Sequence, residues 1–417
     1  MSKISRNLRK EADEALRVGT KVYDYRRDVL EPERRDALCN ALDAVRTLRG
    51  NRNLADESPL RAAVDKLENE MKQCGGTYYP RNALCENFEV FLVAAILAIG
   101  IRMFFIQPFR IPTNSMYPTY NGMTYELFEK AADRPSLPAR MARAVVFGSE
   151  NVQVISPCDG EVVLPVYPTS NPKYRYAMSG RGIRARKWFG LLPEIDVRYT
   201  ALVGGNPVNV DAPADFQMEL MKALFKRFGN PTDEKVTLAE GGVWLYHTGV
   251  NLKKGEQLIC FDVLMGDQLF VDRFSYHFFR PNVGDPIVFR TDIIPGMAEN
   301  ERGKYYIKRL VGTPGDVLQV KEPVLYRNGK PITGAEAFDL NANRVGEYEG
   351  YLADITPRDL VSLELPYTVQ KDTYIGMGDN SDESADSRMW GPMPTNAVVG
   401  RALFIYYPFT RHVGLAK

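Results

Sequence analysis

Apolar and polar positions change period along the chain and divide it into parts of different character. Residues 88–106 form one strongly apolar run, close to the roughly 20 residues that span a bilayer core of about 30 Å. Residues 1–87 instead alternate charges with apolar positions at helical spacing, and Leu38, Leu42 and Val45 begin one such stripe. We therefore expect two or three helices there, as a small bundle or a short coiled coil. Ser58 is the expected N-cap of one of them.

Beyond the apolar run, the segments that the pattern predicts as helices and strands become shorter. Residues 124–148 are expected to hold short helices broken by Pro135 and Pro138, and residues 152–166 read as strands with a turn at 156–160. Apolar residues four apart predict an amphipathic helix over 214–229 that ends at a glycine. Residues 244–261 return to strands around a turn at 253–256.

From residue 266 to 409, short apolar segments alternate with Gly, Pro and Asp turns, which favours antiparallel β structure. Within one expected strand, Tyr306, Lys308 and Leu310 share a face, while Ile307, Arg309 and Val311 share the other. We predict a type II turn directly after this strand, at residues 312–315.

Composition excludes several classes of function. The 417 residues carry a net charge of +1, so no global field favours binding to nucleic acid. With only 3 His, a histidine-rich metal site or a histidine-based triad lacks side chains, and we predict neither metal nor cofactor. The 5 Cys do not resemble a disulfide scaffold, and Cys158 and Cys260 are equally compatible with a bridge and with two free thiols.

Candidate chemistry centres on Ser115, which lies shortly after the apolar run. A serine hydroxyl needs a base to become a nucleophile, and a lysine can serve if burial lowers its pKa toward neutrality. Lys308 is the candidate, although the residues alone leave an ordinary surface lysine as the stronger interpretation. Asp386 and Arg388 lie two apart and can pair, and either Ser384 or Ser387 can bind an amine. The acidic loop around them lacks the spacing of an EF-hand.

Taken together, four ordered motifs resemble those of the bacterial type I signal peptidases, the membrane-bound Ser/Lys peptidases of family S26. They lie at residues 112–119, 266–274 with the strand 284–289, 306–316, and 378–391. This resemblance implies Ser115 as nucleophile and Lys308 as its base. It also implies supporting roles for six residues: the oxyanion-hole hydroxyl of Thr113, Ser384 beside the lysine, Tyr306 lining its pocket, the pair Asp386 and Arg388, and Asp379 in the same loop. Thr113 and Asn114 stand where many relatives carry Ser and Gly.

Residues 123–263 depart from the family, because many relatives have few residues at this place. Their two ends resemble those of a lipoyl- or biotinyl-like barrel-sandwich domain, but no lysine lies on a carrier hairpin. We therefore predict a structural insert that shapes substrate access, and not a carrier. The expected domains are a cytosolic helical extension at 1–87, a transmembrane helix at 88–106, a catalytic domain at 107–122 and 264–417, and this inserted domain.

The resulting prediction is a mainly β protein. An antiparallel catalytic domain follows a single transmembrane helix and an α-helical extension, and carries a large mixed α/β insertion. The resemblance implies removal of signal peptides from preproteins, with small residues preferred before the cleavage site. It places the chain in the inner membrane with its catalytic domain on the exported side, in contact with lipid and the export machinery.

Two alternatives remain open. One is a catalytically silent, membrane-anchored binding protein that acts through the inserted domain. The other is a different Ser/Lys hydrolase, such as a self-cleaving repressor, although such a protein would carry a DNA-binding head.

Overall fold

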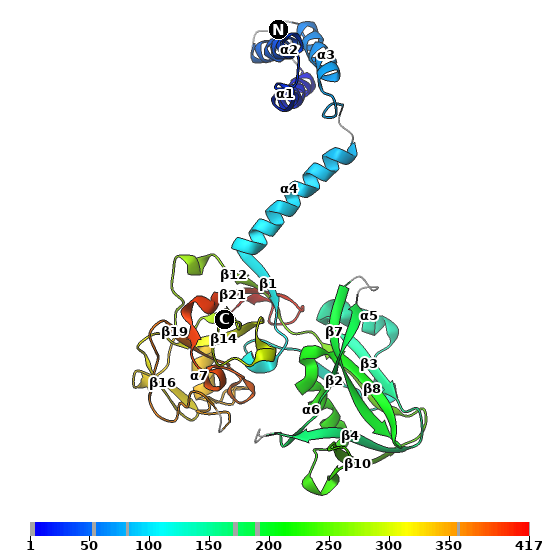
Figure 1. Cartoon of the computed structure of the whole chain (residues 1–417), viewed down its shortest axis with the longest axis vertical. Coiled ribbons are helices and arrows are strands. Elements are labelled where there is room, and N and C mark those ends of the chain that lie inside the picture. The colour runs from blue at the N-terminus through cyan, green and yellow to red at the C-terminus, as the bar shows by residue number, and fades with distance from the viewer. Residues whose placement is uncertain are drawn as a thin grey trace. The chain divides into compact units, whose positions relative to one another are not determined.

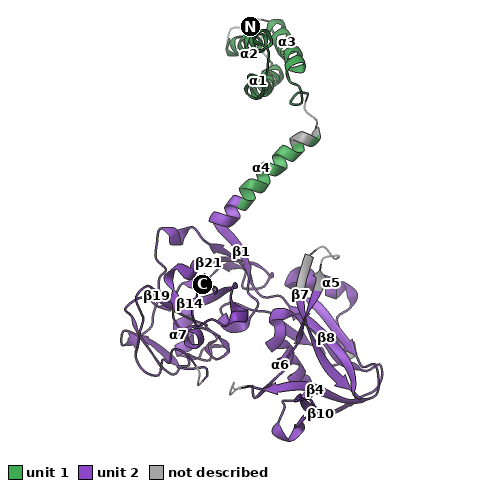
Figure 2. Cartoon of the chain, in the orientation of Figure 1, with its two compact units in different colours: residues 1–99 green, residues 100–417 purple. Residues whose placement is uncertain are grey.

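The computed structural model describes residues 5–51, 56–80, 83–169, 174–187, 192–356 and 359–416 (Figure 1). The chain divides into two compact units, residues 1–99 and 100–417 (Figure 2). Each unit has its own hydrophobic core, so the two are described separately.

The first unit contains a bundle of three helices, α1 (Arg6–Arg26), α2 (Pro32–Gly50) and α3 (Ser58–Cys74). Each of these helices packs on the other two, which makes the extension a bundle rather than a two-stranded coiled coil. The predicted stripe forms part of its core, since Leu38, Leu42 and Val45 are buried.

One detail of the prediction is wrong, because Ser58 is the first residue of α3 and not its cap. The side chain that accepts a hydrogen bond from the first residue of the helix is that of Asp56, two residues before Ser58. The Asp56 carboxylate accepts hydrogen bonds from both the backbone N–H and the hydroxyl of Ser58, at 3.2 and 3.0 Å. Pro59 lies in the first turn, where its missing N–H costs nothing.

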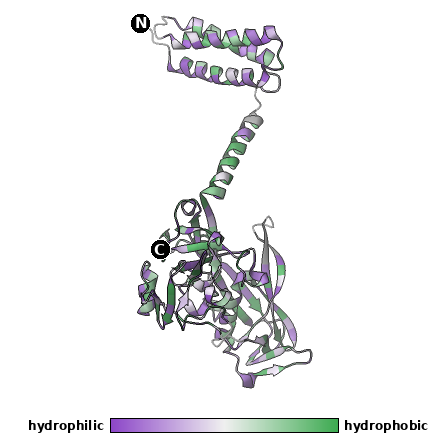
Figure 3. Ribbon diagram, turned by 60° about the vertical axis from the view of Figure 1, so that its left-hand side comes forward, coloured by the Kyte–Doolittle hydropathy of each residue, from purple (hydrophilic) through white to green (hydrophobic). Residues whose placement is uncertain are grey.

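Helix α4 (Ala83–Phe104) is mostly apolar (Figure 3), with Glu89 and Arg102 among its few charged residues. Among the described residues it is the one helix whose length and composition would allow it to cross a membrane, over Asn87–Phe104. The helix ends at Phe104, two residues before the end of the apolar run. Ile106 pairs instead with Asp272 as the first residue of strand β1, and this pairing ends the helix.

In the second unit, the predicted antiparallel β structure is confirmed, since every strand pairing among the residues that the structure describes is antiparallel. The largest sheet of the described residues is built from β1 (Ile106–Arg110), β12 (Gln268–Asp272), β21 (Val398–Tyr407), β13 (Pro286–Arg290), β14 (Tyr305–Gly312), β19 (Thr373–Met377) and β20 (Met393–Pro394), in that order, with β22 (Gly414–Leu415) beside β21.

The part of the chain between β14 and β19 forms a smaller sheet. It consists of β17 (Lys330–Pro331), β16 (Val324–Arg327), β15 (Val317–Lys321) and β18 (Tyr367–Thr368). The short helix α7 (Glu336–Ala342) packs on β16, and the short helix α8 (Ser387–Trp390) follows β19 and packs on it. The predicted type II turn is present one residue later than expected. Asp316 N–H donates to Thr313 O, and Gly315 has a φ of 88°.

The inserted segment forms two further sheets. One contains β6 (Arg181–Lys187), β7 (Leu192–Val203), β4 (Gly160–Pro168), β10 (Trp244–Leu252) and β9 (Val236–Leu238), with β5 (Tyr176–Ala177) and β8 (Asn206–Pro213) at its side. The other contains β2 (Thr124–Leu127), β11 (Gln257–Leu264) and β3 (Glu150–Ile155). The two turns predicted at 156–160 and 253–256 connect β3 to β4 and β10 to β11.

Helices α5 (Leu137–Phe147) and α6 (Gln217–Phe228) belong to the same inserted segment. The helix predicted over 214–229 is confirmed as α6, and Gly229 ends it with a φ of 87°. The expectation for residues 124–148 is partly wrong. Residues 124–127 form β2, because β11 provides a pairing partner far along the chain, and Pro138 lies in the first turn of α5 rather than breaking it.

Hydrophobic packing gives the inserted segment a core of its own, whose buried residues all lie between 123 and 263. The strands on either side of the segment pack into three other cores. Their arrangement brings the serine motif, strand β14 and the loop after β19 together at one place.

Candidate active site

Ser115 lies in the loop that follows β1, in a single 3₁₀ turn (Asn114–Met116). Its neighbours fix it, because Ile111 and Met116 are buried in one core with Leu269 and Val271 of β12. A side chain at Gly122 would meet the backbone of Thr113 at 2.3 Å, so this close approach requires a glycine. The serine is thereby held in a rigid loop and is only 7% exposed.

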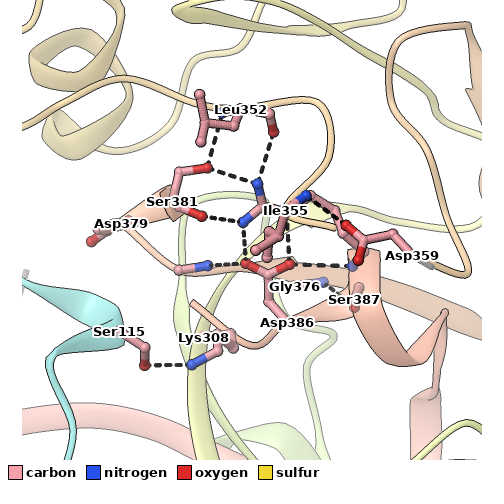
Figure 4. A network of polar contacts seen from close by, with 12 residues as sticks. Ser115, Lys308, Leu352, Ile355, Asp359, Gly376, Asp379, Ser381, Asp386 and Ser387 are labelled. Carbon is pink, nitrogen blue, oxygen red and sulfur yellow. Dashed lines mark hydrogen bonds and ion pairs between the residues drawn. The ribbon is translucent and has the colours of Figure 1, made fainter. Parts of the chain in front are cut away.

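Lys308 approaches Ser115 from the middle of β14. Its Nζ lies 2.6 Å from Ser115 Oγ in a hydrogen bond, and its side chain is 3% exposed (Figure 4). The predicted face of the strand explains part of this burial, because the ammonium lies 5.7 Å from the centre of the Tyr306 ring. Tyr306 is itself fixed by a hydrogen bond to Glu301 and by an edge contact with Trp390.

Burial shifts the chemistry of this lysine. Removal from water disfavours the ammonium and lowers the pKa of Lys308 from its ordinary value to about 8. Arg388 adds to the lowering, while the carboxylates of Asp386 and Asp379 oppose it. A substantial fraction of the amine is therefore neutral near pH 8 and can accept the Ser115 proton.

Asp386 and Arg388 form the ion pair that their spacing predicted. Two contacts join them, Nη2 to Oδ2 at 2.8 Å and Nε to Oδ1 at 2.9 Å, and both side chains are fully buried. The guanidinium also donates to the backbone oxygens of Leu352 and Ser381 (Figure 4). Burial would raise the pKa of Asp386, yet Arg388 and the N–H of Gly378 hold it below its ordinary value, so a carboxylate faces the lysine.

A second buried ion pair escaped the sequence analysis. Arg309, next to Lys308 but on the opposite face of β14, contacts Asp379 through Nε and Nη2 at 2.8 and 2.6 Å. Asp379 also accepts from the Thr119 hydroxyl at 2.6 Å, which ties the loop after β19 to the segment after Ser115. The alternation of β14 could have flagged Arg309, because it falls between Ile307 and Val311 on a face that must be buried.

Ser384 is 1% exposed, and its hydroxyl has no hydrogen-bond partner among the described residues. A methyl group at Gly378 would lie 2.2 Å from Ser384 Oγ and 2.3 Å from Ser115 O, so this glycine lets the two serine segments meet. The predicted bond from Ser384 to the lysine is not formed in the structure. The hydroxyl oxygen of Ser387, the other candidate, accepts a hydrogen bond from the backbone N–H of Gly376 in β19 at 3.1 Å.

A cleft of about 780 Å³ opens beside Ser115 and Lys308. Thr113, the expected oxyanion-hole residue, lines it together with Tyr306 and Ser384. Its other wall comes from the inserted segment, through Tyr174 and residues 214–219. The expectation that the insert shapes substrate access stays a prediction, and the sequence did not show which of its residues line the cleft, since no spacing in the chain relates them to Ser115 and Lys308.

Other candidate chemistry is limited. Cys158 and Cys260 are free thiols, which decides between the two states left open by the sequence. No group of three or more His, Cys, Asp or Glu side chains is arranged to hold a metal ion within the part of the chain that the structure describes.

Comparison with known proteins identifies the family to which the chain belongs. The sequence model of "Signal peptidase, peptidase S26" matches residues 84–170 and 261–407, more than half of the chain. This chain belongs to the signal peptidase family, peptidase S26. The match extends into the insertion at its first end and resumes at β11, so the segment between 170 and 261 lies outside the family's pattern.

Several members of the signal peptidase family are similar to the chain. "Probable signal peptidase I-1" of Synechocystis sp. is 32% identical over 146 residues, which are 35% of this chain and 65% of that protein. Signal peptidase I of Pseudomonas aeruginosa is 30% identical over 169 residues, which cover 34% and 59%. A solved signal peptidase I from Enterococcus faecalis V583 is 28% identical, with a TM-score of 0.23 over 30% of this chain and 97% of that one. The chain spans about three fifths of the length of the first curated relatives that it matches.

The lowered pKa of Lys308 predicts a pH dependence for the reaction of Ser115 with a small acylating inhibitor. Below pH 8 the ammonium form dominates, so the second-order rate constant should fall about tenfold for each pH unit. Above this pKa the rate should level off. A rate measured from pH 6 to 10 that is flat below pH 8 would contradict the assignment of Lys308 as base.

The Arg309–Asp379 pair predicts a large effect on stability. Arg309→Met leaves Asp379 buried and unpaired, and should lower the free energy of unfolding by about 3–5 kcal/mol. Adding Asp379→Leu should recover a large part of this loss, because the uncompensated charge is then gone. Urea unfolding of the single and double variants measures both values, and an equal or greater loss in the double variant would refute this explanation.

Proposed function

We propose that this protein is a membrane-anchored serine endopeptidase, a signal peptidase I, that removes signal peptides from exported preproteins. The observation that carries the proposal is the 2.6 Å contact between Ser115 Oγ and the buried amine of Lys308. Family membership supports the choice of substrate, since the similar proteins are signal peptidases.

Acylation would begin with Ser115 Oγ, which forms a bond to the scissile carbonyl carbon while the neutral Lys308 amine takes its proton. The carbonyl oxygen becomes an oxyanion, and the Ser115 N–H and the Thr113 hydroxyl stabilise it. Loss of one such donor typically costs about 2.7–4 kcal/mol. As the peptide C–N bond breaks, the Lys308 ammonium gives the proton to the leaving amine, and the signal peptide remains as an ester on Ser115.

Deacylation repeats these steps with water. Lys308, neutral again, takes a proton from a water molecule that attacks the ester carbonyl, and returns it to Ser115 Oγ as the acyl group leaves. The base must therefore exchange its proton twice per turnover, which suits a lysine whose pKa burial has lowered to about 8.

The remaining predicted residues serve this exchange. Tyr306 shields the amine from water, and the two buried ion pairs hold Asp386 and Asp379 as fixed charges that stabilise the ammonium once it forms. Ser384 has a buried hydroxyl without a partner, which we assign to orienting the Lys308 ammonium during the reaction.

The proposed position of the protein in the membrane rests on helix α4. In this proposal it crosses the inner membrane once, with the three-helix bundle in the cytosol and the catalytic and inserted domains on the exported side, near the export machinery. The specificity for small residues, such as Ala, before the cleaved bond comes from the family resemblance and belongs to the same proposal.

The test is cleavage of a preprotein with an Ala-X-Ala site by the full chain in lipid. Ser115→Ala and Lys308→Met should each abolish product while leaving the melting temperature within a few degrees, because both act on chemistry. Losses of roughly 10³-fold or more are expected for removal of a nucleophile or its base. Undiminished cleavage by either variant removes that residue from the mechanism, and an inactive wild type favours the anchored binding protein.

Contact with lipid is the second part of the proposal. The sequence offers apolar residues close to the anchor as candidates for lipid contact: Met103, Phe104, Phe105, Phe109, Met116 and Tyr117. Of these, Phe104 and Phe105 are exposed, whereas Met116 is fully buried in the core and is excluded. Exposed aromatic residues occur instead after β12, where Phe274 stacks on Phe105 and Phe278 and Phe279 are exposed. Aromatic rings favour the membrane–water interface.

Replacement of both Phe278 and Phe279 by Ser should therefore raise the KM for a membrane-inserted preprotein several-fold. It should leave cleavage of a short soluble peptide unchanged, because the catalytic pair is untouched. Comparable effects on both substrates would show that these rings support the fold of the active site and not lipid contact.

A further inference from the structure

The inserted segment contacts the catalytic loops through one face of helix α6. Glu219 and Lys222 lie one turn apart on this helix and form an ion pair at 2.9 Å. Lys222 also contacts Glu383 at 2.8 Å, and Glu383 immediately precedes Ser384. The other oxygen of Glu383 accepts from the Tyr174 hydroxyl at 2.9 Å. Both carboxylate oxygens of Glu383 are thus bound by residues of the insertion.

The same helix also holds the serine loop. Asn114, which directly precedes Ser115, donates through Nδ2 to Glu219 Oε1 at 3.1 Å. Its Oδ1 accepts from Gly122 N–H at 2.8 Å, which keeps the amide in that orientation. The contact depends on the Asn114 side chain, since a glycine at this position could not form it.

The two catalytic loops are also bonded to each other at this point. Asn380 donates through its backbone N–H to Ser115 O at 3.2 Å and through its side chain to Asn114 O at 3.0 Å. A continuous series of contacts, Asn114 to Glu219 to Lys222 to Glu383, therefore links the segment that carries Ser115 to the segment that carries Ser384.

The charged side chains in these contacts are partly buried, so solvent weakens their attraction only in part. The side chains of Glu219, Lys222 and Glu383 are 13%, 24% and 17% exposed, and such contacts are screened less by solvent than those at an open surface. Burial opposes the charge on Lys222, but its contacts with Glu383 and Glu219 leave its pKa raised above the ordinary value. The lysine is therefore an ammonium at every pH where Lys308 is active.

We propose that Glu219 and Lys222 are positioning residues of the active site, supplied by the inserted domain. They set the distance between the serine loop and the Ser384 loop, and through it the alignment of Ser115 with Lys308. This inference rests on the proposed function for its catalytic consequence, although the contact itself does not. It assigns the insertion a part in catalysis beyond that of a passive wall of the cleft.

Lys222→Met tests the proposal, with Lys226→Met as its matched control. Lys226 lies one turn further along α6, carries the same charge and is exposed. In the full chain, Lys222→Met leaves Glu219 and Glu383 facing each other without a cation. It should lower the rate of Ser115 acylation per active site by roughly tenfold to a hundredfold, the scale of a misplaced reacting group. Lys226→Met should match wild type, and Lys222→Arg should recover most of the rate.

Two further readouts separate positioning from stability. For a soluble peptide, Lys222→Met should lower kcat more than it raises KM, with a melting temperature close to that of Lys226→Met. Adding Glu383→Gln should cost much less in the Lys222→Met background than in wild type, because the two residues act through one contact. Additive losses would overturn the proposed coupling.

Amide hydrogen exchange tests the contact without any measurement of enzymatic activity. Peptides covering residues 113–122 and 378–386 should exchange faster in Lys222→Met and not in Lys226→Met. If exchange and acylation both match the control, the positioning role is wrong. If wild type shows no acylation at Ser115, the proposed function fails, and faster exchange in Lys222→Met alone would still establish that α6 holds the two loops.

Discussion

A lysine amine kept out of water beside a serine hydroxyl is the constraint on which the rest of this site depends. Burial lowers the pKa of Lys308, but a carboxylate left bare near it would reverse that effect. Each of the two carboxylates that act on Lys308, Asp386 and Asp379, is accordingly paired with a buried arginine, Arg388 and Arg309. The paired charges stay fixed in place, and the lysine loses its proton near pH 8 without an adjacent histidine.

Antiparallel strands make that burial achievable. Strand β14 lies between β13 and β19, so both of its edges are hydrogen-bonded and Lys308 is held against the sheet rather than at its rim. The loop after β19 carries Asp386, whose charge acts on the lysine, and the loop after β1 brings Ser115 to it. Gly378 and Gly122 make these approaches close enough, since a methyl group at either position would overlap the serine segments.

Sequence reasoning was most successful where the signal is local. Strand alternation placed Tyr306 and Lys308 on one face, the spacing of two residues paired Asp386 with Arg388, and a stripe of apolar residues gave α6. It failed where the partner is distant in sequence. Arg309 and Asp379 are 70 residues apart, and Asn114 and Glu219 are 105 apart, so no spacing rule connects them. Residues 124–127 are a strand for the same reason, because only β11 decides between strand and helix there.

Helix α6 shows how one element can serve two purposes. Its apolar face, with Leu220, Leu224 and Phe228, is buried in the core of the inserted segment and needs nothing from the catalytic strands. Its other face presents Glu219 and Lys222 to the loops that carry Ser115 and Ser384. Apolar contacts at that position would fill the cleft and exclude a peptide, whereas a few directed polar contacts fix the loops and leave the space between them open. A module that folds around its own core can in this way be inserted into an enzyme and still become necessary to the geometry of its active site.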